Sequence, residues 1–357
     1  MVAPTMRAAR LDLVTGRIEI CDIPRPRPRA GELLIRVAAA GLCRTDVALI
    51  QGRLRPSGLG SEPLSPRQLT PGHQVVGTVS APGAGVDGWA LGQRVAVHPF
   101  LARRGGVDRL GVDCDGGWAD YVVVPASSVV RLPQALSFEV AAALPSVVAT
   151  AWSAIRGAGA VRPGDGVAVW GIGDLGSQLV RLARLAGATP VIGVDATSDG
   201  RARAEGAGAD AVVDAAADDL ADQLRRAGQG QLPDVVFDAS AVADPRCPAL
   251  DLVRDGGSVV MLGLSDRGIV IDDSTGFVAA RRRLVGHWGS SVEDLVSVLR
   301  LAGSGRLDLS DLSMPVRSLE DAPAEMASVR RDLADRGADR GADRGVLFRP
   351  ARASTTG

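Results

Sequence analysis

The sequence has no lysine, only three histidines and four cysteines, and no long run of apolar or like-charged residues. The absence of lysine excludes a catalytic lysine, such as a Schiff-base residue. The cysteines are Cys21, Cys43, Cys114 and Cys247, which lie far apart and form no CxxC pair. Neither a disulfide framework nor a four-cysteine zinc module is therefore expected.

Charge and hydropathy exclude two large classes of partner. The 40 basic residues are balanced by 41 acidic residues, and the formal net charge is −1. No block of like charge marks a nucleic-acid or anionic-membrane surface. No uninterrupted apolar stretch reaches the ~18 residues that span a bilayer, and residues 1–7 lack the apolar core of a secretion signal. We expect a soluble cytoplasmic protein whose partner is a small-molecule substrate.

The pattern along the 357 residues predicts two domains and an α/β fold. Residues 1–150 contain short β segments separated by Gly and Pro. In residues 151–286, strands alternate with Ala- and Leu-rich helical periods, which is typical of a parallel sheet with crossover helices. Residues 287–357 contain a helix and a final extended piece, 345–350, which we expect to return to the first domain.

The strongest single motif is the run Val167-Ala-Val-Trp-Gly-Ile-Gly-Asp-Leu-Gly176, an apolar strand that enters a GxGxxG turn. Gly171 allows the tight turn, Gly173 lets the backbone approach a pyrophosphate, and Gly176 lets the following helix pack on the strand. Asp174 and Leu175 belong to the same cofactor run, and the helix predicted after it, Ser177 to Ala186, offers free N–H groups that suit phosphate oxygens. The motif predicts a dinucleotide cofactor.

The cofactor's ribose is expected at Asp195, which ends the next strand. A carboxylate there accepts both ribose hydroxyls of NAD and repels the extra phosphate of NADP, so NAD(H) is favoured over NADP(H). Arg201 and Arg203 leave an alternative open, because they could reach a 2′-phosphate if residues 196–200 fold back. The other interpretation is two solvated arginines at a helix start.

Several phrases carry a resemblance to a known family. They are Ala39-Ala-Gly-Leu-Cys-Arg-Thr-Asp46, Thr70-Pro-Gly-His-Gln-Val-Val-Gly-Thr-Val79, Gly116-Gly-Trp-Ala-Asp-Tyr121, the cofactor run, and Gly256-Gly-Ser-Val-Val-Met-Leu-Gly-Leu264. Over nearly its whole length the chain resembles the medium-chain dehydrogenase/reductase superfamily, and the zinc alcohol dehydrogenases in particular.

The resemblance implies a fold and an assembly. It implies a GroES-like β-rich catalytic domain over 1–150, completed by 287–357, and a doubly wound Rossmann domain over 151–286. A homodimer or homotetramer through the edge of the Rossmann sheet, near Gly263 to Asp272, is also implied.

The resemblance further assigns roles to single residues. Cys43 and His73 occupy the positions of the first two catalytic zinc ligands, Thr45 that of the hydroxyl relay, and Asp46 that of the carboxylate that orients the histidine. If zinc is present, Cys43 and His73 would bind it, since thiolate and imidazole are ordinary zinc ligands. Among cofactor contacts the resemblance assigns Arg44, Gly263, Leu264 and Arg344 as well.

The metal site departs from the family pattern at several positions. Ser146 stands where the third ligand, a cysteine, is expected, Gln74 replaces a glutamate, and Ala48 replaces the relay histidine. The four-cysteine structural zinc lobe is absent between residues 97 and 116. Because a catalytic zinc has three protein ligands, we expect no zinc. The alternative is a site completed by Asp113, Cys114 or Asp115.

An intact cofactor site beside a degenerate metal site predicts a zinc-independent, NAD(P)H-dependent reductase. Its substrate would be an activated C=C or carbonyl compound in specialised metabolism, with Thr45 donating a hydrogen bond to the enolate and His73 orienting or protonating it. Two alternatives stay open: a zinc-dependent alcohol dehydrogenase with an unusual ligand set, and a cofactor-binding sensor or non-redox enzyme on the same fold.

Overall fold

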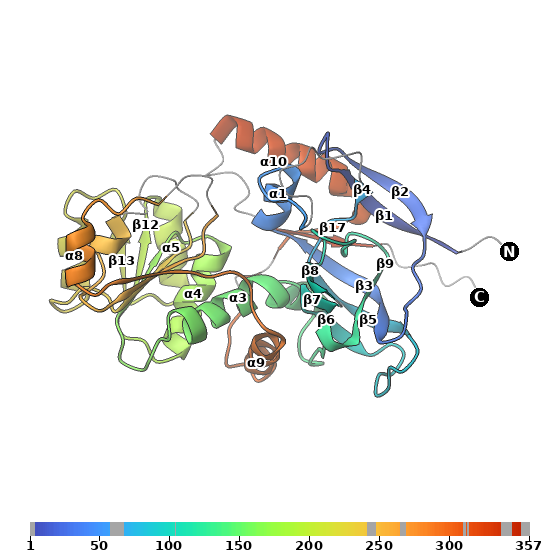
Figure 1. Cartoon of the computed structure of the whole chain (residues 1–357), viewed down its shortest axis with the longest axis horizontal. Coiled ribbons are helices and arrows are strands. Elements are labelled where there is room, and N and C mark those ends of the chain that lie inside the picture. The colour runs from blue at the N-terminus through green and yellow to red at the C-terminus, as the bar shows by residue number, and fades with distance from the viewer. Residues whose placement is uncertain are drawn as a thin grey trace. The chain divides into compact units, whose positions relative to one another are not determined.

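The structure is a computed structural model that describes residues 4–57, 68–103, 105–240, 248–264, 269–309, 312, 314–336 and 345–350 (Figure 1). The chain divides into two compact units. Unit 1 comprises Met1–Ser146 and Ser291–Gly357, and unit 2 comprises Val147–Ser290. Cys247 and Arg344 lie outside the described residues.

The described part of unit 1 contains two β-sheets and a β-hairpin, in which most strands pair antiparallel. A seven-stranded sheet has the order β10-β6-β5-β3-β18-β17, with β9 pairing with β3 as well; a three-stranded sheet has the order β2-β1-β4; β7 and β8 form a hairpin. Their bounds are β1 Thr5–Asp12, β2 Ile18–Pro24, β3 Glu32–Leu42, β4 Gln68–Leu69, β5 Gln74–Pro82, β6 Arg94–Val97, β7 Phe100–Arg103, β8 Gly106–Arg109, β9 Tyr121–Pro125, β10 Val129–Arg131, β17 Val316–Ser318 and β18 Val346–Arg349.

The core of unit 1 is closed by its last strand. The extended piece expected at 345–350 is β18, which pairs antiparallel with β3 through Val346 opposite Leu42. The buried ring of Phe348 packs edge-on against Trp118 with ring centroids 4.8 Å apart. The indole N–H of Trp118 donates to the carbonyl of Gly41 at 3.2 Å, so this large side chain is a satisfied core residue.

The helices of unit 1 are few and short except near its C-terminal part. They are α1 Arg44–Ile50, α2 Phe138–Ala141, α9 Val292–Gly303 and α10 Ala322–Arg336, with 3₁₀ turns at Ala126–Ser128 and Leu319–Asp321. α2 opens a continuous helical run, Phe138–Ala158, that continues through π-helical turns into unit 2. By length and composition alone this run could cross a membrane, but 56% of its apolar window is buried inside the protein, as in the core helix of a soluble protein.

Unit 2 is a doubly wound α/β domain, and the predicted fold class is confirmed. Its six parallel strands have the order β13-β12-β11-β14-β15-β16, which is the 3-2-1-4-5-6 order of dinucleotide-binding sheets. The strands are β11 Val167–Trp170, β12 Val191–Asp195, β13 Ala211–Asp214, β14 Val235–Asp238, β15 Ser258–Met261 and β16 Arg283–Gly286. The helices are α3 Ala149–Ser153, α4 Asp174–Leu185, α5 Ser198–Gly206, α6 Leu220–Ala227, α7 Pro248–Asp251 and α8 Ser274–Ala279.

The parallel register brings three strand ends to one edge of this sheet. Trp170 at the end of β11 lies opposite Val194 of β12 and Asp238 of β14. The strand order reverses between β11 and β14, and ligands of open α/β sheets bind at the carboxyl edge beside such a reversal. The glycine turn after Trp170 therefore occupies the expected binding edge.

Ion pairs and hydrogen bonds hold the segment that follows the β7–β8 hairpin. After the β7–β8 hairpin, the Asp113 carboxylate accepts from Nε of Arg109 at 2.8 Å and from the backbone N–H groups of Arg109 and Ser57. Burial by itself would raise the pKa of Asp113, but these donors and the Arg109 charge lower it to about 2. Asp115 pairs in turn with Arg10 at 2.7 Å.

We expect the Asp113 network to contribute acid-sensitive stability. Because the pKa of Asp113 is lower in the folded chain than the ~3.9 of an unfolded chain, its contribution is present above that value and is lost as the pH falls toward 2. Asp113→Asn should lower the free energy of unfolding by about 1 kcal/mol at pH 7 and by much less near pH 2. Urea unfolding at several pH values measures this. Asp108→Asn, in the preceding strand β8 and with a side chain that is 43% exposed and paired with Arg103, is the control. Equal pH dependence in wild type and Asp113→Asn would contradict the assignment.

Candidate functional site

The start of α1 fixes two of the predicted site residues. Cys43 is the N-cap, and its sulfur accepts from the backbone N–H of Thr45 at 3.3 Å. Asp46, in the third helical position, reaches back and accepts from the backbone N–H of Cys43 at 2.9 Å. Residues 43–46 therefore form a reciprocal capping box, which holds the thiol and the carboxylate in fixed positions.

His73 reaches the same place from the segment before β5. Gly72 has φ +95°, and an added Cβ would lie 2.2 Å from the Trp118 ring, so this position requires glycine. The N–H of Gly72 donates to Asp46 Oδ1 at 3.2 Å, which ties the segment to α1. Two loops distant in sequence are thereby joined through one carboxylate.

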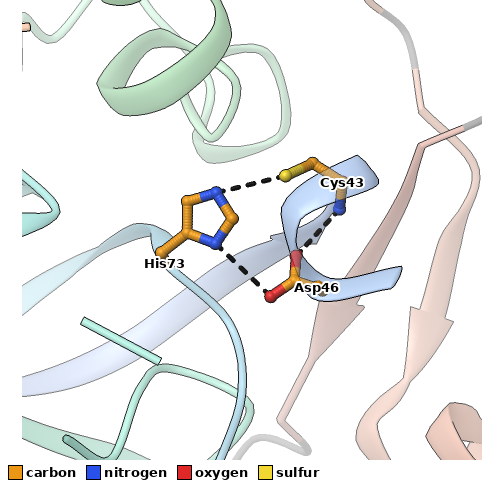
Figure 2. Close-up of side chains that lie close together, drawn as sticks. All are labelled: Cys43, Asp46 and His73. Carbon is orange, nitrogen blue, oxygen red and sulfur yellow. Dashed lines mark hydrogen bonds and ion pairs between the residues drawn. The ribbon is translucent and has the colours of Figure 1, made fainter. Parts of the chain in front are cut away.

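The imidazole of His73 lies between the thiol and the carboxylate (Figure 2). Its Nε2 is 3.1 Å from Cys43 Sγ, and its Nδ1 is 3.3 Å from Asp46 Oδ1. His73 is 6% exposed and Asp46 is fully buried. Burial lowers the pKa of His73, but the negative charges of Cys43 and Asp46 outweigh it and raise the pKa well above 6.5. The arrangement favours a cationic imidazole.

Cys43, Asp46 and His73 form a group of potential metal ligands, whose donor atoms lie within 4.8 Å of one another. The two ring nitrogens face different neighbours, however. An ion on Nε2 would lie on the Cys43 side of the ring, whereas Asp46 contacts Nδ1, the position of an orienting carboxylate. Within the described ranges no further Cys, His, Asp or Glu joins the group. This donor set is one ligand short of a catalytic zinc site.

Asp113, Cys114 and Asp115, the three residues proposed as a third metal ligand, contact other groups. The carboxylates of Asp113 and Asp115 are bound to Arg109 and Arg10, as described above. Burial raises the pKa of the Cys114 thiol to about 11, and its sulfur is 4.0 Å from the carbonyl oxygen of Arg109. The alternative that one of these three completes the site has no support from their contacts.

The family's other metal-site positions hold neutral side chains. Ser146 lies in the π-helical segment Leu144–Val148, and Ala48 is buried in α1. Gln74 is 1% exposed, and its Oε1 has no hydrogen-bond partner in the part of the chain that the structure describes. None of the three brings a negative charge toward Cys43 and His73.

In unit 2, each glycine of the GxGxxG turn has the geometry that the motif predicts. Gly171 has φ +87°, and an added Cβ would lie 2.7 Å from the backbone nitrogen of Ser240. Gly173 caps α4 and has open space where a Cβ would be. At Gly176 a Cβ would lie 2.0 Å from the carbonyl oxygen of Gly171, so helix and strand pack closely there. Asp174 and Leu175 form the first turn of α4. The open face at Gly173 and the helix start suit a pyrophosphate.

Asp195 ends β12 beside this turn. Its Oδ2 accepts from the N–H of Ile172 at 2.8 Å, and its Oδ1 accepts from the N–H and hydroxyl of Thr197. Arg201 donates to the carbonyl of Asp195 and pairs with Asp214, while Nε of Arg203 donates to the carbonyl of Ile172 at 2.7 Å. Both arginines thus donate to backbone carbonyls, and Arg203 is at the same time exposed, as the interpretation as solvated arginines at a helix start expects.

The end of β14 contributes residues that sequence reasoning missed. Asp238 is buried and accepts from the N–H and hydroxyl of Ser240 at 2.9 and 2.6 Å. Ser240 packs against both Gly171 and Gly263, where an added Cβ would clash with its backbone. The signal was available, because an Asp and a Ser directly follow a buried strand at the binding edge.

The other predicted cofactor residues are Leu264, Arg44 and Arg344. Leu264 follows Gly263 and is 40% exposed. Arg44 is exposed on the first turn of α1 in unit 1, and Arg344 lies outside the described residues.

Comparison with known proteins covers both units. Residues 29–134 match the alcohol dehydrogenase GroES-like domain, and residues 175–304 match the zinc-binding dehydrogenase family. An alcohol dehydrogenase of Rhizobium meliloti is 31% identical over 85% of this chain and 90% of its own length. An NAD-dependent alcohol dehydrogenase of Sulfurisphaera tokodaii is 28% identical over 85% and 90%. A crystal structure described as a zinc-binding dehydrogenase of Sinorhizobium meliloti, bound to NADP, superposes with TM-score 0.83 and 27% identity over 97% of this chain and 100% of that one.

We expect alanine substitutions at two glycines of the turn to have different effects, one on cofactor binding and one on stability. Gly173→Ala places a methyl group in open space, so it should change the melting temperature little but weaken NADH binding at least tenfold. Gly176→Ala places its methyl against the Gly171 carbonyl and should lower the melting temperature by several degrees, because about 1–3 kcal/mol of overpacking strain results. Calorimetric NADH titration and thermal unfolding of both variants separate the effects. Equal loss of stability in the two would contradict the assignment.

Proposed function

Because the chain belongs to the medium-chain dehydrogenase/reductase superfamily, as an alcohol dehydrogenase-like NAD(P)-dependent oxidoreductase of small molecules, we propose that it works without a catalytic zinc. In this proposal it reduces an activated C=C or carbonyl group. The observation that carries the proposal is the donor set: one thiol and one imidazole nitrogen face each other, and the nearby carboxylate contacts the other ring nitrogen.

The residues of unit 2 fit a nicotinamide dinucleotide. Gly173 and the N-terminus of α4 would hold the pyrophosphate, and the Asp195 carboxylate would accept from the ribose hydroxyls. When bound, the cofactor supplies the hydride. We propose NAD(H) as the preferred form, because Asp195 is held by Ile172 and Thr197 at the ribose position and would repel a 2′-phosphate.

Unit 1 supplies the group that stabilises developing charge in this proposal. When a hydride adds to the β-carbon of an enone, the π pair of the C=C bond forms the double bond of the enolate and the π pair of the C=O bond moves onto the oxygen. The α-carbon then takes a proton from His73 or from solvent, and the carbonyl reforms. Thr45 is half-buried on the same helix turn as Cys43, and its hydroxyl is the donor we assign to that oxygen. In this proposal His73, whose Nδ1 contacts Asp46, orients the substrate or protonates the enolate.

A second candidate is a zinc-dependent alcohol dehydrogenase with an unusual ligand set. It is favoured by the grouping of Cys43, Asp46 and His73 and by similarity to proteins named alcohol dehydrogenase. In that case Cys43 and His73 would bind the metal, and Asp46 is the third potential ligand of the group among the described residues.

The two candidates predict different metal contents and reactions. For untagged protein purified without chelator, we expect far less than one zinc per chain and NADH-dependent reduction of cyclohexenone that survives chelator. Thr45→Val should lower kcat/KM about 10²- to 10³-fold, because one charge-stabilising donor is lost, whereas Thr45→Ser should retain most activity. One zinc per chain with chelator-sensitive alcohol oxidation would overturn the proposal in favour of the second candidate.

We also propose that the protein is a homo-oligomer through the edge of the unit 2 sheet. Strand β16 ends the sheet order, and several exposed large apolar side chains lie near it in sequence: Leu264, Ile269, Val270, Ile271, Val278 and Trp288. Exposed apolar patches are typical of protein–protein interfaces, and a second copy satisfies an open strand edge.

Light scattering after size-exclusion chromatography tests this assembly. We expect a mass of at least two chains at micromolar concentration, and a shift toward the single-chain mass in Val270→Asp, which buries an unpaired charge in the interface. Leu91→Asp, an equally exposed apolar position in unit 1, should leave the mass unchanged. A single-chain mass for the wild type would contradict the proposal.

A further inference from the structure

The peptide groups of Ile172 link two parts of unit 2. Ile172 is fully buried between Gly171 and Gly173, in the middle of the cofactor turn. Its N–H donates to Asp195 Oδ2 at 2.8 Å, and its carbonyl accepts from Nε of Arg203 at 2.7 Å. Both backbone polar groups are therefore held by side chains from outside the turn.

The turn needs such restraints because it has few of its own. Gly171 and Gly173 flank Ile172, and glycine is the residue with the most backbone freedom to lose. The N-cap position of α4 is Gly173, which offers no side chain to bind the first N–H groups of the helix. The orientation of the free N–H groups at the pyrophosphate position thus depends on what holds the Ile172 peptides.

Arg203 is well placed for this task. It lies on α5, which packs against β12 and contacts α4. The side chain of Arg203 therefore extends from α5 to the glycine turn that precedes α4. The start of α5 is itself locked to the end of β12. Thr197 caps the helix and also donates to Asp195, and an added Cβ at Gly200 would lie 2.1 Å from the Asp195 carboxyl carbon.

We propose that Arg203 is a positioning residue for the cofactor, which acts through the carbonyl of Ile172. This inference rests on the proposed dinucleotide cofactor. By fixing that peptide plane, Arg203 presents Gly173 and the start of α4 to the pyrophosphate. Asp195 holds the preceding peptide plane, so ribose recognition and pyrophosphate recognition share Ile172. The guanidinium serves NADH and NADPH alike, since its bond goes to the protein and not to a 2′-phosphate.

The test compares three variants by calorimetric titration of NADH, NADPH, ADP-ribose and adenosine. Arg203→Met keeps the apolar stem and removes the donor; it should raise the Kd of NADH, NADPH and ADP-ribose by the same factor, about tenfold for a charge-assisted bond. Adenosine, which has no phosphate, should change less than twofold. Arg203→Lys restores a cationic donor and should recover most of the affinity. Arg225→Leu, an exposed arginine of α6 paired only with Asp222 in the described contacts, is the control.

Steady-state kinetics adds a second readout. Arg203→Met should raise the KM of NADH and leave kcat and the substrate KM within twofold, because the bound cofactor is still aligned. Unchanged NADH affinity in Arg203→Met would overturn the inference, as would a loss confined to NADPH, which would mean a direct phosphate contact. Wild-type protein that binds NADH but reduces no enone would refute the proposed reaction alone, since the binding comparison needs no turnover.

Discussion

The start of α1 and the segment before β5 depend on one buried carboxylate. Asp46 accepts hydrogen bonds from the backbone of Cys43 and of Gly72 and contacts the imidazole of His73. A fully buried charge is tolerated only with such partners, and these come from two segments that are about thirty residues apart in sequence. The carboxylate therefore closes the start of α1, fixes the loop before β5 and sets which nitrogen of His73 faces the thiol. Loss of any one of these contacts would leave the charge poorly satisfied.

That constraint also shapes the chemistry. Since Asp46 occupies one side of the imidazole, only Nε2 remains for a metal or for the thiol. Ser146, Gln74 and Ala48 are neutral, whereas the family pattern has a cysteine, a glutamate and a histidine at these positions. The chain therefore lacks the cysteine and glutamate charges that would favour a bound cation. The imidazole of His73 therefore lies between two acidic groups, Cys43 and Asp46, whose negative charges raise its pKa and offset the charge of the ring.

The fold of unit 2 could be predicted from the sequence because its signals are local. An apolar strand, three glycines at fixed spacing and a terminal aspartate follow from short-range geometry, and the structure has each of them in the predicted conformation. The β-rich character of unit 1 was also predictable. The contacts of Arg203 and of Asp113 were not, because both depend on how separate elements pack and no spacing rule records that. From the sequence, the serine at the third-ligand position predicted that Cys43 and His73 lack a partner for zinc. Which ring nitrogen of His73 faces the thiol became known only from the structure.

The path of the chain has a consequence for folding during synthesis. Unit 2 is continuous in sequence, whereas the seven-stranded sheet of unit 1 pairs β3 with β18, a strand that leaves the ribosome about three hundred residues later. The Rossmann domain can complete its core while β3 still has an open edge. Unit 1 has by contrast a high contact order and finishes last, so the nascent protein carries an open edge at Ala40–Leu42 of β3 through most of its synthesis. Slow closure of this sheet, more than its final stability, is where the chain is most exposed to misassembly.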